Sequence, residues 1–135
     1  MQNCTFYGND ADVEGGAFRF VRADVRGANI VIYSNTQDPI ALAPSSSLQL
    51  SYSNVEGGWS GPGNISADPK FVSWNGIQAI PSPRSPCIDS GTGAADALDW
   101  SSLHPAYGRI NTATPDMGAY GGFYGRTWLA TPLSP

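Results

Sequence analysis

Charged side chains are scarce in this chain, since Asp, Glu, Lys and Arg make up only 13% of its 135 residues. Seven Lys and Arg stand against eleven Asp and Glu, which leaves no basic surface for the phosphates of a nucleic acid. Apolar runs are short as well, and none approaches the roughly 20 residues that a helix needs to span a bilayer. We therefore expect neither nucleic-acid binding nor a membrane span.

Long stretches without glycine or proline are lacking too. The chain contains 16 Gly and 11 Pro, whereas a helical bundle needs long runs free of both. Leu, Ile, Val and Phe number only 26, but fifteen aromatic residues and a net charge of −4 argue against disorder. The composition thus predicts a single all-β domain with many tight turns and only short helical pieces, such as 94–100 with Thr92 as its cap.

Cysteine and histidine are rare. Cys4 and Cys87 are compatible with a disulfide, with two buried thiols, or with one of each, and their spacing leaves this open. The one histidine, His104, has no Cys or acidic residue at metal-ligand spacing, so we expect it to be structural or exposed. No apolar leader precedes the first strand-like segment, so a leader either lies upstream or export by that route does not occur.

Apolar and polar residues alternate in short runs, which is the pattern of a half-buried strand. Three runs end in a tyrosine followed two residues later by asparagine, at Tyr7, Tyr33 and Tyr52. Such a unit, recurring about every 20 to 25 residues, is typical of a stacked solenoid in which each Asn amide bonds the next. The third unit is out of step, because Leu48 and Leu50 have the opposite phase relative to their Asn. The four runs are Cys4–Phe6, Phe18–Phe20, Ile30–Tyr33 and Leu48–Tyr52.

The composition changes near residue 55. Residues 1–55 contain four Gly and two Pro, whereas residues 56–135 contain twelve Gly and nine Pro. We expect one domain over 1–135, with about three to four rungs of stacked strands in 1–55 and a loop-rich C-terminal wrap in 56–135.

Four short motifs occur in an order that resembles one known pattern. It is similar to the C-terminal end of the bacterial secreted right-handed parallel β-helix proteins, the pectate-lyase-like group, and the segment 3–9 with Gly15-Gly16-Ala17 resembles one of their rungs. The resemblance implies a short right-handed parallel β-helix and an extracellular or cell-surface location. The four motifs are Tyr52–Trp59, Gly63–Phe71, Ser85–Gly91 and Pro115–Tyr120.

The chain departs from that pattern at both ends. Members of the group continue upstream for many rungs, whereas this chain begins in mid-rung without an N-terminal cap. An uncapped rung exposes strand edges that invite pairing with another copy, so we expect a homodimer through the N-terminal rung. Gly121 stands where the group usually has an acidic residue, and the role of the tail 121–135 stays open.

Arginine and tryptophan supply the candidate binding surface. Arginines on the outer face of a β-helix are suited to the carboxylates of uronic acids, and Trp rings stack on sugars. The alternatives are a solvated charged face and Trp side chains that cover an open end of the stack. The predicted carbohydrate-binding residues are Arg19, Arg22, Trp59 and Trp74.

Acidic residues alternate at Asp10, Asp12 and Glu14, which is the opening spacing of a calcium loop. The twelfth position of such a loop is Val21 rather than an acid, so a solvated turn is the main expectation and a weak Ca²⁺ site the alternative. We expect no other cofactor. Three further acids beside Pro or Gly are expected to cap their own turns, namely Asp68, Asp89 and Asp116.

Signatures of catalysis are missing from the sequence. It contains neither the acid, His and Arg motifs associated with polygalacturonases and pectate lyases nor a Gly-x-Ser-x-Gly elbow. We therefore expect a non-catalytic β-helix module that binds polysaccharide or assembles with itself. The alternatives are a remnant polysaccharide lyase or glycoside hydrolase, and a purely structural cap of a larger surface protein.

Overall fold

The computed structural model describes residues 1–74, 76–93 and 114–119. The described residues are all-β, as expected, and no helix occurs among them, so none in these ranges is long and apolar enough to cross a membrane. The short helix expected near 94–100, His104 and the tail 121–135 lie outside these residues. The strands are β1 (Gln2–Tyr7), β2 (Phe18–Phe20), β3 (Asp24–Tyr33), β4 (Ile40–Leu42), β5 (Ser47–Ser51), β6 (Asn54–Val55), β7 (Phe71–Trp74) and β8 (Ile77–Pro81).

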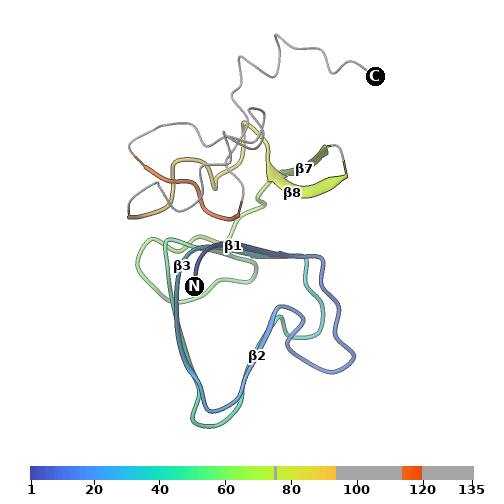
Figure 1. Ribbon diagram of the computed structural model, residues 1–135, viewed down its shortest axis with the longest axis vertical. Helices are drawn as coiled ribbons and strands as arrows, with labels where there is room; N and C mark the ends of the chain where they lie inside the picture. Colours follow the sequence, from blue (N-terminus) through green and yellow to red (C-terminus); the bar gives the residue numbers. More distant parts are fainter. Residues whose placement is uncertain (75, 94–113, 120–135) are drawn as a thin grey trace.

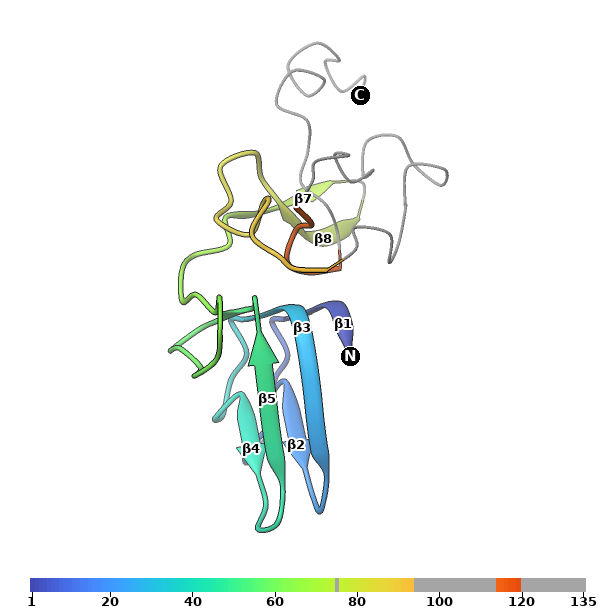
Figure 2. The ribbon, with the colours of Figure 1, turned by 90° about the vertical axis from the view of Figure 1, so that its left-hand side faces the viewer.

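The first six strands form what we call the strand stack, residues 2–55. In it β3 lies between β1 and β5 and also pairs with β6, while β2 pairs with β4, and every one of these pairings is parallel. Paired residues are 22 to 26 positions apart, so the chain completes one circuit before it returns beside itself. Figure 1 looks along the stacking direction, where successive circuits overlap, and Figure 2 shows the same strands side by side.

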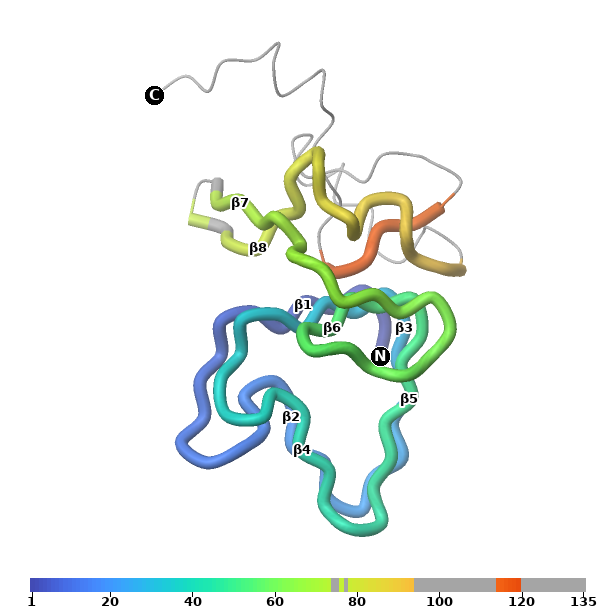
Figure 3. Tube along the Cα trace, turned by 180° about the vertical axis from the view of Figure 1, so that it is seen from behind, coloured from blue at the N-terminus to red at the C-terminus, as the bar shows by residue number. Residues whose placement is uncertain are grey.

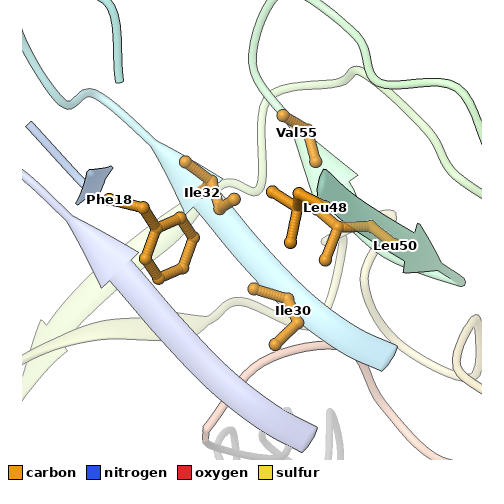
Figure 4. Close-up of a cluster of buried hydrophobic side chains, with 6 residues drawn as sticks. All are labelled: Phe18, Ile30, Ile32, Leu48, Leu50 and Val55. Atoms are coloured by element: carbon orange, nitrogen blue, oxygen red, sulfur yellow. The ribbon is translucent and has the colours of Figure 1, made fainter. Parts of the chain in front are cut away.

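Alternate residues of the stacked strands point inward and form the main core. Ile30 and Ile32 are fully buried, and Leu48 and Leu50 lie beside them (Figure 4). The alternation predicted from the sequence is confirmed for all four runs, since Cys4, Phe6 and Phe20 pack against this cluster too. The buried members are Phe18, Ile30, Ile32, Leu48, Leu50 and Val55.

The corners of the circuits repeat one backbone conformation. Asn3, Asn29 and Tyr52 occupy the same position in three successive layers, and their φ angles are 50°, 57° and 47°. Asparagine tolerates this left-handed region better than most residues, since its short amide bonds locally. The chain therefore turns at the same place in each circuit. A second such column contains Gly8, Ser34 and Gly57.

The third repeat is displaced relative to the first two. Tyr7 pairs with Tyr33, but the register of β3 with β5 sets Tyr52 beside Asn29 instead. The predicted Asn stack is confirmed for Asn9 and Asn35, whose side chains are joined by a 2.8 Å hydrogen bond. It does not extend to the third unit, because the register sets Asn54 beside Val31 and not beside Asn35.

The described chain beyond residue 65 lies along one side of the strand stack (Figure 2). Strands β7 and β8 form an antiparallel pair (Figure 3), and residues 85–93 and 114–119, here called the C-terminal strap, run beside the outer face of β3. A second core cluster forms there from Val31, Cys87 and Met117. Val31 points away from the main core because it alternates with Ile30 and Ile32 along β3.

Candidate functional site

One end of the strand stack, beyond β5, is closed by side chains. The indole Nε1 of Trp59 donates to the Leu48 carbonyl at 3.3 Å, and Nδ2 of Asn64 donates to the Leu50 carbonyl at 3.0 Å. These carbonyls lie on the outer edge of β5, where another strand would otherwise bond. Trp59 is also packed against the main core. Two side chains thus take the place of one more strand.

The backbone around this closure follows the edge of β5 closely. The Tyr52 amide donates to the Pro62 carbonyl at 2.8 Å, and the Val55 amide donates to Ile65 at 2.9 Å. Gly61 approaches so closely that an added Cβ would collide with the Leu50 carbonyl. We call residues 56–65 the closing loop, since they cover the edge of β5 at this end of the stack.

The opposite end, at β1, lacks such a closure among the described residues. β1 is an edge strand that pairs with β3 alone, and no described segment pairs with the outer side of β2. The aromatic rings of this first layer contact one another, with centroid distances of 4.2 Å for Phe6–Phe18 and 5.3 Å for Phe18–Phe20. Phe6 and Phe20 are only partly buried. This end therefore combines unpaired strand edges with an apolar layer.

Asn29 fastens the C-terminal strap to the stack. Its buried amide donates to Asn3 Oδ1 at 2.9 Å and to the Thr92 carbonyl at 2.8 Å, and its Oδ1 accepts from the Thr92 amide at 2.8 Å. The Gly118 amide donates to the Asn29 carbonyl at 2.8 Å, and the Ala119 amide donates to Thr5 Oγ1 at 2.9 Å. The strap thus satisfies backbone and side-chain groups at the corner and on the outer face of the sheet.

The two cysteines are both free thiols. They lie on opposite sides of the sheet, since Cys4 packs in the main core and Cys87 in the second cluster, so the disulfide that the sequence left open is not formed. Burial raises the pKa of the Cys87 thiol; hydrogen bonds from Asn54 and Ser85 oppose this shift, and the charge of Asp116 adds to it. The thiol therefore stays protonated at neutral pH.

The outer face of the first half of β3 is open, in contrast to the half beneath the strap. Asp24, Arg26 and Ala28 point outward there, beside Ser47, Gln49 and Ser51 of β5. Two adjoining depressions of about 520 Å³ and 280 Å³ share Arg26 as a lining residue. We call this region the Arg26 face.

The predicted carbohydrate-binding residues come from three parts of the molecule, namely β2 with the turn after it, the closing loop, and β7. Arg19 in β2 donates to Glu14 at 2.8 Å, while Arg22 is exposed at the turn into β3. Trp59 belongs to the closing loop and matches the alternative considered for it, a ring that covers an end of the stack. The backbone of Trp74 ends β7. No hydrogen bond or ion pair within the described ranges joins any two of Arg19, Arg22 and Trp59.

The predicted calcium ligands have other partners or point to solvent. Glu14 accepts from Arg19, the Asp10 carboxylate accepts from the Thr36 hydroxyl, and Asp12 is exposed. Within the described part of the chain, no group of three or more His, Cys, Asp or Glu side chains gathers as metal ligands would.

Two of the acids expected to cap turns are bonded to backbone amides. Asp68 accepts from the Lys70 amide at 2.8 Å, so this prediction of a local cap is confirmed. Asp116 accepts from the amide of Asp89 at 2.8 Å, and thereby joins the two segments of the strap. Its partner lies 27 positions away, and only the fold brings the two together.

Sequence reasoning missed Asn64 and the role of Asn29. Asn64 lies in a glycine-rich loop where no sequence repeat indicates a role for it. Its amide bonds the Leu50 carbonyl only because the fold brings this loop to the edge of β5. The spacing of Asn3 and Asn29, which equals that of Asn9 and Asn35, was the available signal for the buried pair. Comparison of the chain with protein-family models, curated protein sequences and solved structures gives no significant match.

Proposed function

We propose that the chain is a non-catalytic module, built as a short right-handed parallel β-helix, that associates with a second copy through the open end at β1. The observation that carries the proposal is the difference between the two ends of the strand stack. One end has its edge carbonyls bonded by Trp59 and Asn64, whereas β1 has no partner on its outer side among the described residues.

The β-helix part of the proposal is supported by the register. Parallel partners recur at offsets of 26 residues between β1 and β3 and 23 residues between β3 and β5, as in the side-chain contacts Asn3–Asn29 and Asp24–Ser47. Connections between parallel strands of one sheet are right-handed in nearly all proteins. A right-handed parallel β-helix is the simplest arrangement consistent with the recurring offsets and with the usual handedness of such connections.

The self-association part is supported by the chemistry of an open strand edge. Unpaired N–H and C=O groups on an edge bind another strand readily, and proteins usually blunt such edges with charge, proline or a cover. In the first layer Phe6, Phe18 and Phe20 add apolar surface next to the edge. A second copy offers the same edge and the same rings, so the surface is self-complementary across a two-fold axis.

This geometry limits the assembly to two copies. Across the two-fold axis β1 would run antiparallel to β1 of the partner, and each copy would keep its closing loop on the far side. The closing loop occupies the edge of β5, and a two-fold contact through β1 uses the same surface of both copies, so no third copy can join at β1. The expected product is a closed dimer and not a filament.

Sedimentation equilibrium over a concentration series of the purified chain tests the proposal. Val21, which is 53% exposed and directly follows β2, is changed to Lys, and Val13, which is 80% exposed in the loop before β2, receives the same change as a control. We expect Val21→Lys to weaken association at least about tenfold through charge at the open end, and Val13→Lys to leave it unchanged. A wild-type chain that stays monomeric at all concentrations would refute self-association.

A structural cap is the second candidate, and the closing loop favours it. Trp59 and Asn64 would seal the last layer of a longer stack as they seal this one. In that case the isolated chain is monomeric and Val21→Lys has no effect on its sedimentation.

Enzymatic turnover would contradict the non-catalytic part of the proposal. Incubation of the chain with polygalacturonate, followed by absorbance of unsaturated sugars in the ultraviolet, detects lyase activity directly. We expect no increase over a buffer control.

A further inference from the structure

The Arg26 face presents an unpaired guanidinium between two depressions. Arg19 with Glu14 forms the one ion pair in the described part of the chain, so Arg26 has no carboxylate partner there. Its side chain is exposed on β3, and Gln49 is its neighbour on β5. Gln2 and Ser51 line the larger depression together with Arg26, while Ser47 and Gln49 line the smaller one.

We propose that the Arg26 face binds the carboxylate, sulfate or phosphate group of an elongated, hydroxyl-bearing polymer. A guanidinium offers planar paired donors that match such oxyanions, and this geometry makes arginine the side chain best suited to them. The surrounding amides and hydroxyls both donate and accept, which is what the hydroxyl groups of a polymer require.

The shape of the face indicates an elongated ligand. Both depressions are open to solvent and adjoin at Arg26, one toward β1 and the other toward the start of β3. A small molecule would be poorly enclosed in either one, whereas a chain laid across both would contact Arg26 in the middle and amides on each side. Binding sites for small ligands are usually far more enclosed.

The acidic residue of this face is Asp24, and its carboxylate already accepts a hydrogen bond. Asp24 accepts a hydrogen bond from the Ser47 hydroxyl at 2.6 Å, in the row of side chains next to Arg26. Its negative charge would repel an anion placed beside it, so the oxyanion belongs on the side of Arg26 that faces Gln2 and Ser51. The smaller depression then receives uncharged hydroxyl groups.

The site differs from the surface predicted from the sequence. Arg26 lies on the outer face of β3, whereas Trp59 is bonded to Leu48 at the closed end of the stack. The inference goes beyond the proposed self-association, since it concerns ligand binding at the outer face of β3 and β5, where the larger depression reaches Gln2 of β1.

Matched polymers separate the three oxyanion classes. Carboxymethyl dextran, dextran sulfate and phosphorylated dextran carry different anions on one backbone, and neutral dextran is the control. Each is titrated into the ¹⁵N-labelled chain, and amide shifts are followed at 24–28 and 47–51. We expect at least one anionic dextran to move these amides and neutral dextran to bind at least about tenfold more weakly.

Substitutions then assign the binding to Arg26. Arg26→Gln should weaken binding of the active dextran at least about tenfold, and Arg26→Lys should retain part of it. Arg22→Gln removes the same charge from an exposed residue that lines neither depression, so it should change the affinity less than about twofold. Circular dichroism of each variant shows whether it is folded before it is titrated.

Three results would overturn the proposal. Equal weakening by Arg26→Gln and Arg22→Gln would show attraction by net charge alone. Shifts confined to residues outside 24–28 and 47–51 would place the binding elsewhere. An absence of amide shifts with all four dextrans would show that the Arg26 face binds no ligand of the proposed class.

Discussion

Buried asparagines hold the described parts of this molecule together. Asn29 is 3% exposed, and its side chain makes bonds to Asn3 and to both backbone groups of Thr92. Asn54 is fully buried, donates to Ala67 and to the sulfur of Cys87, and accepts from the Ala67 amide. An amide satisfies both kinds of backbone group at once, which explains its use where strand layers meet irregular chain.

Removal of the Asn29 amide should be costly. Asn29→Ala leaves the buried Asn3 oxygen and the Thr92 groups without these bonds, and places alanine at a φ of 57°. We expect a loss of about 2 to 4 kcal/mol in the free energy of unfolding. Asn9→Ala, in the exposed pair with Asn35, should cost only about 0.5 to 1 kcal/mol. Urea denaturation of the two variants measures the difference, and equal losses would contradict this role of Asn29.

Stability should fall at alkaline pH, in part through Cys87. Burial raises the pKa of this thiol above its ordinary value of 9.0, so the folded chain binds the proton more tightly than the unfolded chain does. The stabilisation is complete below about pH 9 and is lost as the pH rises through the folded pKa. The pKa of Tyr33 is also raised, first by burial and then by the charges of Asp68 and Glu56. The loss of stability therefore extends to higher pH.

Cys87→Ala isolates the contribution of the thiol. Urea denaturation at intervals from about pH 7.5 to pH 10 should give a shallower decline for this variant than for the wild type. The comparison concerns slopes, because the variant also loses packing against Val31 and Met117 at every pH. Identical slopes would show that Cys87 does not titrate differently in the folded chain.

The closing loop acts as a substitute for a strand. Its backbone follows the edge of β5, and its two side-chain donors reach carbonyls two residues apart, at Leu48 and Leu50. Such a spacing matches the repeat of groups along one edge of a strand. An irregular segment can therefore end a sheet without leaving its last polar groups unpaired.

Substitutions in the closing loop should separate its hydrogen bonds from its packing. Trp59→Phe keeps an aromatic ring on the main core but loses the donor to Leu48, so we expect a loss of about 1 kcal/mol. Trp59→Ala removes the packing as well and should cost about 3 to 5 kcal/mol. Chemical denaturation checks both values, and a cost below about 1 kcal/mol for the alanine variant would refute a closing role.

Gly61 tests how closely the loop must approach. Gly61→Ala pushes a Cβ into the Leu50 carbonyl and should cost more than about 2 kcal/mol. Gly57→Ala meets nothing nearby but has a φ of 81°, so its cost should stay near 1 kcal/mol. Hydrogen exchange should also quicken at the Tyr52 amide in the Gly61 variant alone, since that amide bonds Pro62.

Strand β3 joins the two core clusters of the molecule. Ile30 and Ile32 face the main core, and Val31 between them faces Cys87 and Met117. If β3 separates from one cluster, the buried residues of the other cluster are exposed as well. The two clusters should therefore unfold together.

Cooperative unfolding follows from this arrangement. Leu50→Ala in the main core and Met117→Ala in the second cluster should each lower the stability by about 2 to 5 kcal/mol. Both should shift one transition that far-ultraviolet circular dichroism and tryptophan fluorescence report alike. Separate transitions in either variant would show that the strap unfolds independently of the strand stack.

Much of the strand stack was predictable because its causes are local. Alternation in runs such as Ile30–Tyr33 reflects which side chains can share a face of a strand, and the confirmed inward residues follow from it. The cap formed by Asp68 on Lys70 is equally local. The positions of Trp59 and Asn64 were not predictable, because their acceptors depend on where the closing loop crosses β5.

The sequence alone was sufficient to predict an all-β chain with recurring strands and corners. The signals for these features, alternation with a period of two residues and residues that favour left-handed turns, act over a few neighbouring residues. Three-dimensional packing settled which residues stand beside the third repeat, the opposite placement of Cys4 and Cys87, and the bond of Asp116 to Asp89. It also left β1 without a partner on its outer side in the described ranges, and Arg26 exposed beside two depressions. Contacts between residues tens of positions apart are not encoded by any local pattern. The lengths of the circuits between strands determine which residues meet.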